Sequence, residues 1–204
     1  MLVISLDSIP GTISGMLQAL KGVPAFAASF AQIMFFWSAH ATWSRRYGID
    51  DRHGTLLSLV LVFLVLVYVY PLKIMFSAFF AWISGGWFPP VAEIRSLADL
   101  QGMFTMYGLA FGSMSLLMAA LNRQALRAQV SPPLSEYERQ STRGEIVHWL
   151  YSATVAAGSI VFAMLIPAQS PGWLYGMPGM FYGMLGFTGV VVDRFAPVSP
   201  PAPR

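Results

Sequence analysis

The hydrophobic positions of this chain fall into five long runs that short polar segments separate. A helix needs about 20 apolar residues to cross a bilayer core of about 30 Å. Between Leu56 and Phe80 the only charged residue is Lys73, so this run is the clearest membrane signal. We predict five spanning helices in one transmembrane domain, residues 1–195, at about residues 23–43, 56–82, 103–121, 146–166 and 173–192.

This pattern predicts an all-α fold, a polytopic membrane helix bundle. The proline-rich tail, residues 196–204, is predicted to be disordered. Hydrophobic residues make up 56% of the chain and charged residues 10%, whereas soluble domains carry about 25% charged residues. The composition therefore points to a lipid bilayer as the surroundings of this chain.

The charge and residue content of the chain exclude several classes of function. The net charge of +3 is small and the arginines lie in loops, so we expect no nucleic-acid partner. The chain has no cysteine, which excludes disulfides, thiolate metal sites and cysteine catalysis. The three histidines match no metal-binding spacing, and no set of nucleophile, base and acid is visible. We therefore expect no enzyme activity, metal or cofactor.

Basic residues predict the orientation in the membrane. Cytoplasmic loops of membrane proteins carry an excess of lysine and arginine. Here the first loop, the third loop and the tail hold Arg45, Arg46, Arg52, Arg123, Arg127, Arg139, Arg143, Arg194 and Arg204. The other side holds Lys21 and Arg95. We expect a cytoplasmic C-terminus, most simply in a bacterial plasma membrane, and an N-terminus outside. Either a short N-terminal segment is translocated or, as we favour, an upstream helix enters from the cytoplasm and ends near residues 2–4.

Polar residues near the end of the first run are candidates for a network between helices. Trp37, His40 and Trp43 share one helix face because they are three residues apart. An ionisable residue within a membrane is a functional candidate, so His40 is interpreted either as a pH-sensitive group or as a hydrogen-bonded contact between helices. Asp51 is interpreted either as the N-cap of the next helix or as part of a cytoplasmic gate.

Small residues mark candidate surfaces of helix packing. Gly108 and Gly112 form a GxxxG pair, and a stripe on the last run comprises Gly176, Gly179, Gly183, Gly186 and Gly189. Glycine lets two helix backbones approach closely in lipid. We expect these positions to face neighbouring helices.

The order of these features resembles the transmembrane protein 175 potassium channels in their short prokaryotic form. In that family the second helix carries a tryptophan and a histidine and is followed by a basic loop and an aspartate, as Trp37, His40, Arg45, Arg46 and Asp51 do here. A leucine-rich third helix ends in a proline, as at Pro71, and the fourth resembles residues 107–123. The resemblance implies a potassium channel subunit that passes potassium ions passively through an oligomeric pore, with a homotetramer favoured.

This sequence also departs from the family. The family has a phenylalanine–serine–aspartate motif on a first, pore-lining helix, and neither is present; residues 2–4 would be the last turn of that helix. Val60 stands where the family has an asparagine, and no residue can be assigned to a selectivity filter. Two alternatives stay open: a non-conducting membrane scaffold or partner-dependent truncated subunit, and a small transporter. The transporter is less favoured because the sequence shows no broken helix or inverted repeat.

Overall fold

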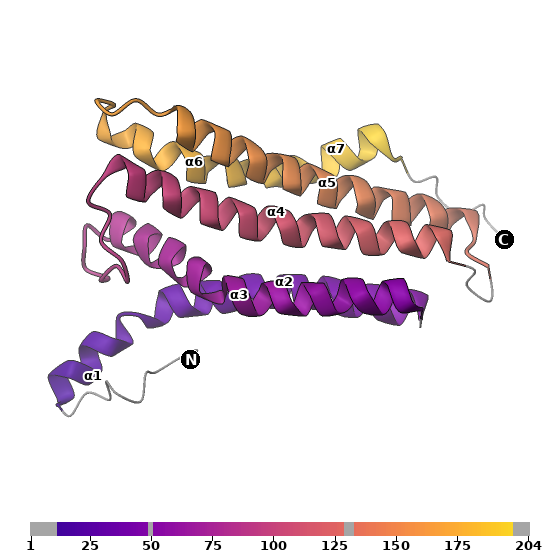
Figure 1. Cartoon of the computed structure of the whole chain (residues 1–204), viewed down its shortest axis with the longest axis horizontal. Coiled ribbons are helices and arrows are strands. Elements are labelled where there is room, and N and C mark those ends of the chain that lie inside the picture. The colour runs from indigo at the N-terminus through magenta and orange to yellow at the C-terminus, as the bar shows by residue number, and fades with distance from the viewer. Residues whose placement is uncertain (1–11, 49–50, 129–132, 198–204) are drawn as a thin grey trace.

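The computed structural model describes residues 12–48, 51–128 and 133–197, and all regular secondary structure within them is helical. Neighbouring long helices run antiparallel in one elongated bundle (Figure 1). The predicted all-α fold class is therefore confirmed. The first five helices are α1 (Ile13–Leu20), α2 (Val23–Tyr47), α3 (Arg52–Ile83), α4 (Leu97–Arg127) and α5 (Glu136–Leu165).

The long helices extend beyond the apolar runs because polar residues cap them. Ser96 and Ser135 each accept a hydrogen bond from a backbone N–H three positions later, and Asp99 and Glu138 return one. These capping boxes satisfy N–H groups that the first turn of a helix leaves without partners. Four segments are long and apolar enough to cross a membrane: residues 13–47 taken together, α3, α4 and α5.

Pro71 lies inside α3 and not at its end, since the helix continues to Ile83. Proline has no backbone N–H and its ring crowds the preceding turn, so a helix bends where it occurs. Figure 1 shows the C-terminal part of α3 leaving the line of its first part. The resemblance compared Pro71 with a proline at the end of a helix. That comparison is wrong for this chain, because Pro71 lies at a bend within a longer helix.

The last predicted span is an uninterrupted run of four short helical pieces that alternate between 3-10 and α geometry. These are the 3-10 helix η2 (Gly172–Gly176), α6 (Met177–Met180), the 3-10 helix η3 (Phe181–Phe187) and α7 (Thr188–Phe195). Glycine weakens an α-helix because its backbone loses the most freedom on folding, and glycines recur throughout this segment. The predicted span is therefore a continuous helical segment of mixed 3-10 and α geometry.

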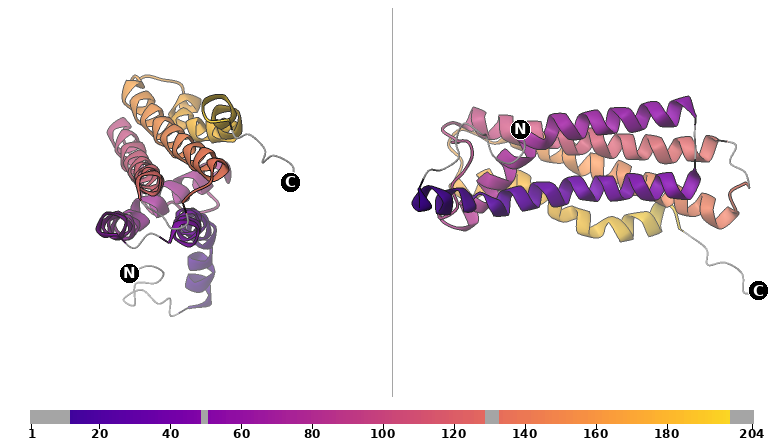
Figure 2. Two further views of the ribbon diagram at one scale, coloured as in Figure 1. Left: turned by 90° about the vertical axis from the view of Figure 1, so that its right-hand side faces the viewer. Right: turned by 90° about the horizontal axis from the view of Figure 1, so that it is seen from below.

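Helices α4 and α5 form the centre of the bundle. They pack along their length, α2 and α3 cover one side of them, and the segment η2–α7 covers another (Figure 2). Phe36, Met114, Met118, Leu121 and Trp149 are almost completely buried between these layers. The interior of the described bundle is therefore filled with side chains.

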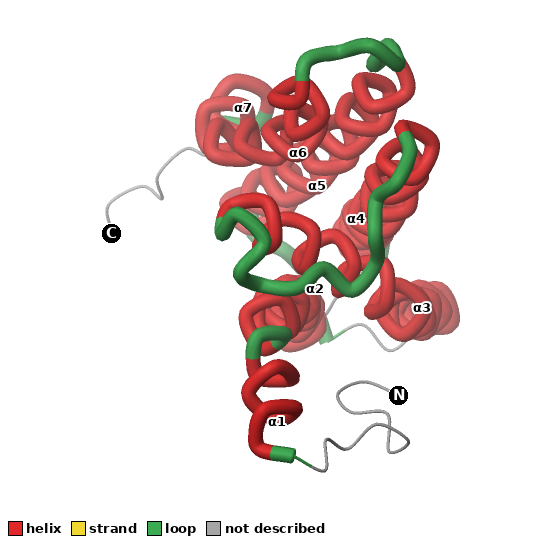
Figure 3. Tube along the Cα trace, turned by 90° about the vertical axis from the view of Figure 1, so that its left-hand side faces the viewer, coloured by secondary structure: helices red, strands yellow, loops and turns green. Residues whose placement is uncertain are grey.

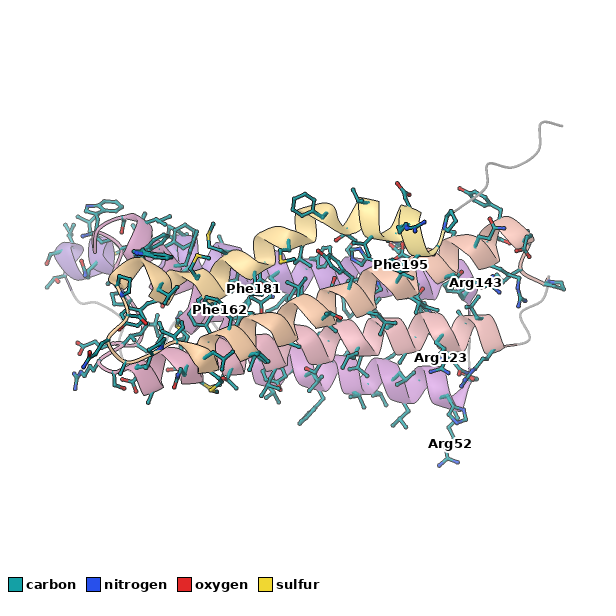
Figure 4. All side chains as sticks on the ribbon, turned by 90° about the horizontal axis from the view of Figure 1, so that it is seen from above. Arg52, Arg123, Arg143, Phe162, Phe181 and Phe195 are labelled. Carbon is teal, nitrogen blue, oxygen red and sulfur yellow. The ribbon has the colours of Figure 1, made fainter. Side chains whose placement is uncertain are left out.

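The two ends of the bundle differ in charge. The connections from α2 to α3 and from α4 to α5 lie at the same end as α7 (Figure 1). Figure 4 shows Arg52, Arg123 and Arg143 together at this end, which we call the arginine-rich end. The opposite end holds α1 and the loops that follow α3 and α5.

Candidate helix network at the arginine-rich end

Two aromatic side chains tie the last turns of α2 to the centre of the bundle. The indole Nε1 of Trp43 donates a hydrogen bond of 2.9 Å to the backbone carbonyl of Leu121 on α4. The hydroxyl of Tyr47 lies 2.6 Å from Oγ1 of Thr142 on α5, and Thr142 donates its own proton to the carbonyl of Glu138. Tyr47 is therefore the donor to Thr142. Both aromatic residues are buried, so α2 is held to α4 and α5.

Asp51 joins the start of α3 to α4. One of its carboxylate oxygens accepts a hydrogen bond of 2.7 Å from the backbone N–H of Gly54, which makes Asp51 the N-cap of α3. The other oxygen accepts a hydrogen bond from the side-chain amide of Gln124. One carboxylate thus both begins a helix and fixes it to its neighbour.

His40 contacts α3 through a single polar bond. Its Nε2 lies 2.8 Å from the hydroxyl oxygen of Ser58, and its ring lies against Trp37 and Trp43 on its own helix, with centroids 6.0 and 5.8 Å away. Trp37 is 54% exposed and Trp43 is buried, so the three neighbouring rings extend from the surface of the bundle into its interior. The histidine is placed to hold α2 and α3 in register.

The two adjacent arginines of α2 differ in their contacts. Arg46 donates a hydrogen bond of 3.3 Å to the hydroxyl of Ser141 on α5, and its guanidinium lies 5.4 Å from the ring of Tyr47. Arg45 is exposed. Of the residues selected from the sequence, His40, Arg46 and Asp51 therefore contact other helices, through partners on α3, α4 and α5 that the sequence did not identify.

An open groove of about 650 Å³ lies beside this network, between α2, α5 and α7. Its walls combine the charged side chains of Arg46 and Glu145 with aromatic rings such as Trp149. Within residues 12–48, 51–128 and 133–197, no three histidine, aspartate or glutamate side chains come close enough to hold a metal ion.

The bundle resembles known membrane proteins in fold and sequence. No protein-family model matches the chain. A protein of Marivirga tractuosa named "Potassium channel" is 28% identical over 167 residues, which cover 79% of this chain and 67% of that protein. A crystal structure of a variant of the potassium channel MtTMEM175, bound to a Nanobody–MBP fusion protein, matches with a TM-score of 0.76 and 26% identity. The match covers 92% of this chain and 82% of that one.

The chain is a TMEM175-like protein. The match extends over nearly the whole chain, so the fold as well as the sequence supports this assignment. With four segments long and apolar enough to cross a bilayer, the TMEM175-like chain is an integral membrane protein. The resemblance drawn from Trp37, His40 and the basic loop is thereby confirmed as a likeness to potassium channels in both sequence and fold.

Two expectations from the resemblance concern positions where this chain departs from the family. The last turn of a pore-lining helix, expected at residues 2–4, lies outside the described residues. Val60, where the resemblance led us to expect an asparagine, lies on α3 and is 37% exposed. Its side chain has no polar atom and cannot form the hydrogen bond of an asparagine.

The glycines of the TMEM175-like bundle differ in how closely other helices approach them. A Cβ atom added at Gly108 would lie 2.5 Å from the side chain of Ile160 and 3.3 Å from the carbonyl of Ala156, and one at Gly112 would lie 3.4 Å from Cβ of Ala156. Helices α4 and α5 therefore pack closely at this pair. A Cβ atom added at Gly158 on α5, a glycine that the sequence did not single out, would likewise lie 3.2 Å from the ring of Phe181.

The glycine stripe of the last segment is only partly covered. A Cβ at Gly179 would be 3.6 Å from Phe104, and one at Gly176 would be 3.9 Å from Trp82. Gly183, Gly186 and Gly189 have no described atom within 4 Å of such a Cβ. The close packing expected at these three positions is therefore not present within the described part of the chain.

Proposed function

We propose that this chain is a subunit of a potassium channel that passes potassium ions passively and needs no cofactor. The observation that carries the proposal is the extent of the match. The fold of a potassium channel is shared over 92% of this chain at a TM-score of 0.76, and the sequence of another is shared over 79% of it. Such a match involves the whole bundle and not an isolated motif.

The pore is proposed to lie between several copies of the chain, with a tetramer favoured. Water and ions need a lumen with polar walls or a gated constriction. The centre of the described bundle is instead filled by side chains such as Phe36, Met114 and Leu121, each 0% exposed. By contrast, the outer surfaces of α2 and α3 are mostly exposed and are available to lipid and to neighbouring subunits.

The arginine-rich end is proposed to face the cytoplasm of a bacterial cell, which places the C-terminus inside. The support is the distribution of charge. Arg52, Arg123 and Arg143 lie at one end (Figure 4), whereas Lys21 and Arg95 lie near α1 and the loop after α3 at the other. Positive loops are retained on the cytoplasmic side during insertion.

Potassium flux into liposomes tests the proposed channel function. We expect purified chain in potassium-loaded vesicles to release potassium when a membrane potential is imposed, without a counter-transported ion. Protein-free vesicles are the control, and valinomycin sets the maximal release. Release that requires a second ion gradient would favour the transporter. Folded, oligomeric protein that releases no potassium would favour the scaffold or a partner-dependent subunit.

His40 is expected to make this flux pH-dependent. Protonation changes which ring nitrogens of His40 donate to Ser58 and its surroundings. We expect the flux of the parent chain to change with pH and that of His40→Ala to be independent of pH. Ser58→Ala keeps the histidine but removes the bond and is the control. If His40→Ala retains the parent pH profile, the role of His40 is structural alone.

A further inference from the structure

Helix α1 has an apolar face that no part of the described bundle covers. Ile13, Met16, Leu17 and Leu20 recur at the spacing of one helix face, and they are 79%, 57%, 60% and 59% exposed. Ser14 and Gln18 follow the same spacing on another face, and Lys21 caps the helix. This helix of eight residues is thus amphipathic and contains no residue that is buried in the chain.

A contact with the loop after α3 fixes where α1 lies relative to the bundle. Figures 1 and 3 show that it leaves the bundle sideways from the start of α2, at the end opposite the arginine-rich end. The ammonium of Lys21 lies 5.1 Å from the ring centroid of Trp87 in the loop after α3. This cation–π contact ties the junction of α1 and α2 to the bundle.

The same end of the bundle has the aromatic residues that mark a membrane surface. Trp82, Trp87 and Trp173 are each at least 60% exposed, and they belong to the end of α3, the following loop and η2. Exposed tryptophan and lysine concentrate at the level of the lipid headgroups because their side chains have both apolar and polar parts. The contact between Lys21 and Trp87 therefore places α1 at the level of the bilayer interface.

We propose that α1 lies in this interface as a lipid anchor, with its apolar face at the boundary between headgroups and acyl chains. An eight-residue helix is about 12 Å long and is too short to span, whereas short amphipathic helices bind in the interface plane. Its apolar face is continuous with the lipid-exposed surface of α2, where Val23 and Phe30 are 50% and 53% exposed. Lipid is therefore the partner that covers both the apolar face of α1 and this surface of α2.

Site-directed labelling tests the anchor directly, because the chain has no cysteine of its own. Leu17→Cys and Gln18→Cys place a label on neighbouring residues of the apolar and polar faces. The full chain, labelled with a polarity-sensitive fluorophore, is reconstituted in phosphatidylcholine vesicles. We expect blue-shifted emission at position 17 and several-fold stronger quenching there by spin labels near the headgroups than at position 18. Aqueous iodide should quench position 18 more strongly.

Two controls keep the outcome interpretable. Leu59→Cys on α3, an exposed position within the long apolar run, reports contact with acyl chains, and circular dichroism of each variant reports the fold. Equal access of iodide to positions 17 and 18 would overturn the anchor. A label at position 17 that neither iodide nor lipid spin labels can reach would also overturn it and would indicate that a second copy covers α1. Neither outcome depends on potassium flux.

Discussion

Replacing Trp43 by alanine is expected to lower the free energy of unfolding by about 4 kcal/mol, because removing a large buried aromatic side chain leaves a cavity. Trp43 is 5% exposed and contacts the ring of Tyr47 on its own helix. Its indole also donates the hydrogen bond that joins α2 to the carbonyl of Leu121. The substitution therefore removes both packing and a polar link between α2 and α4.

Two variants separate these contributions. Trp43→Phe keeps most of the ring volume and loses the donor, so we expect a loss of about 1 kcal/mol, typical of one hydrogen bond. Trp37→Ala changes a tryptophan on the same helix that is 54% exposed, and we expect less than about 1 kcal/mol from it. Denaturant unfolding in detergent micelles, followed by circular dichroism, measures all three. Equal losses for Trp37→Ala and Trp43→Ala would contradict the packing described for α2.

Replacing Gly108 by leucine is expected to force α4 and α5 apart and to cost about 3 kcal/mol, at the upper end for an overpacked core. Even a single Cβ at this position would lie 2.5 Å from Ile160 and 3.3 Å from the carbonyl of Ala156. The Ile160 side chain can rotate away, but the backbone carbonyl moves only if α5 moves. The two most closely packed helices of the bundle would therefore separate.

Gly102 provides the matched control on the same helix. A Cβ at Gly102 meets no described atom within 4 Å, so Gly102→Leu should be neutral or slightly stabilising, since leucine favours helix more than glycine does. Combining Gly108→Ala with Ile160→Ala should recover part of the loss caused by Gly108→Ala alone, because the second substitution makes room. Thermal unfolding in micelles measures each variant. If the leucine variants of Gly102 and Gly108 unfold alike, the close approach of α4 and α5 is refuted.

The sequence singled out candidate residues of the helix network but did not identify the residues to which they bond. His40 and Asp51 were selected because a histidine within an apolar run and an aspartate before one are unusual. The residues that bond to them, Ser58 and Gln124, carry no such signal, since serine and glutamine are common at helix surfaces. The partner of Trp43 is a backbone carbonyl, which no side-chain pattern reveals.

The sequence by itself determined that this chain is a bundle of membrane helices, and it indicated the family. Apolar runs of about 20 residues in a charge-poor chain satisfy the thickness of a bilayer, and a backbone in lipid must bond to itself as a helix. Local signals, such as Ser96 with Asp99 at the start of α4, also mark helix ends without help from distant residues.

Only the tertiary structure decided which faces of these helices meet. A run that is apolar on all sides, such as residues 56–80, gives a helix no preferred rotation about its axis, so packing against its neighbours sets that rotation. For this reason Gly108 lies against α5 while Gly183 meets no described neighbour, although both are glycines at similar spacing in the sequence. The alternation of 3-10 and α pieces in the last span is likewise visible only in the structure.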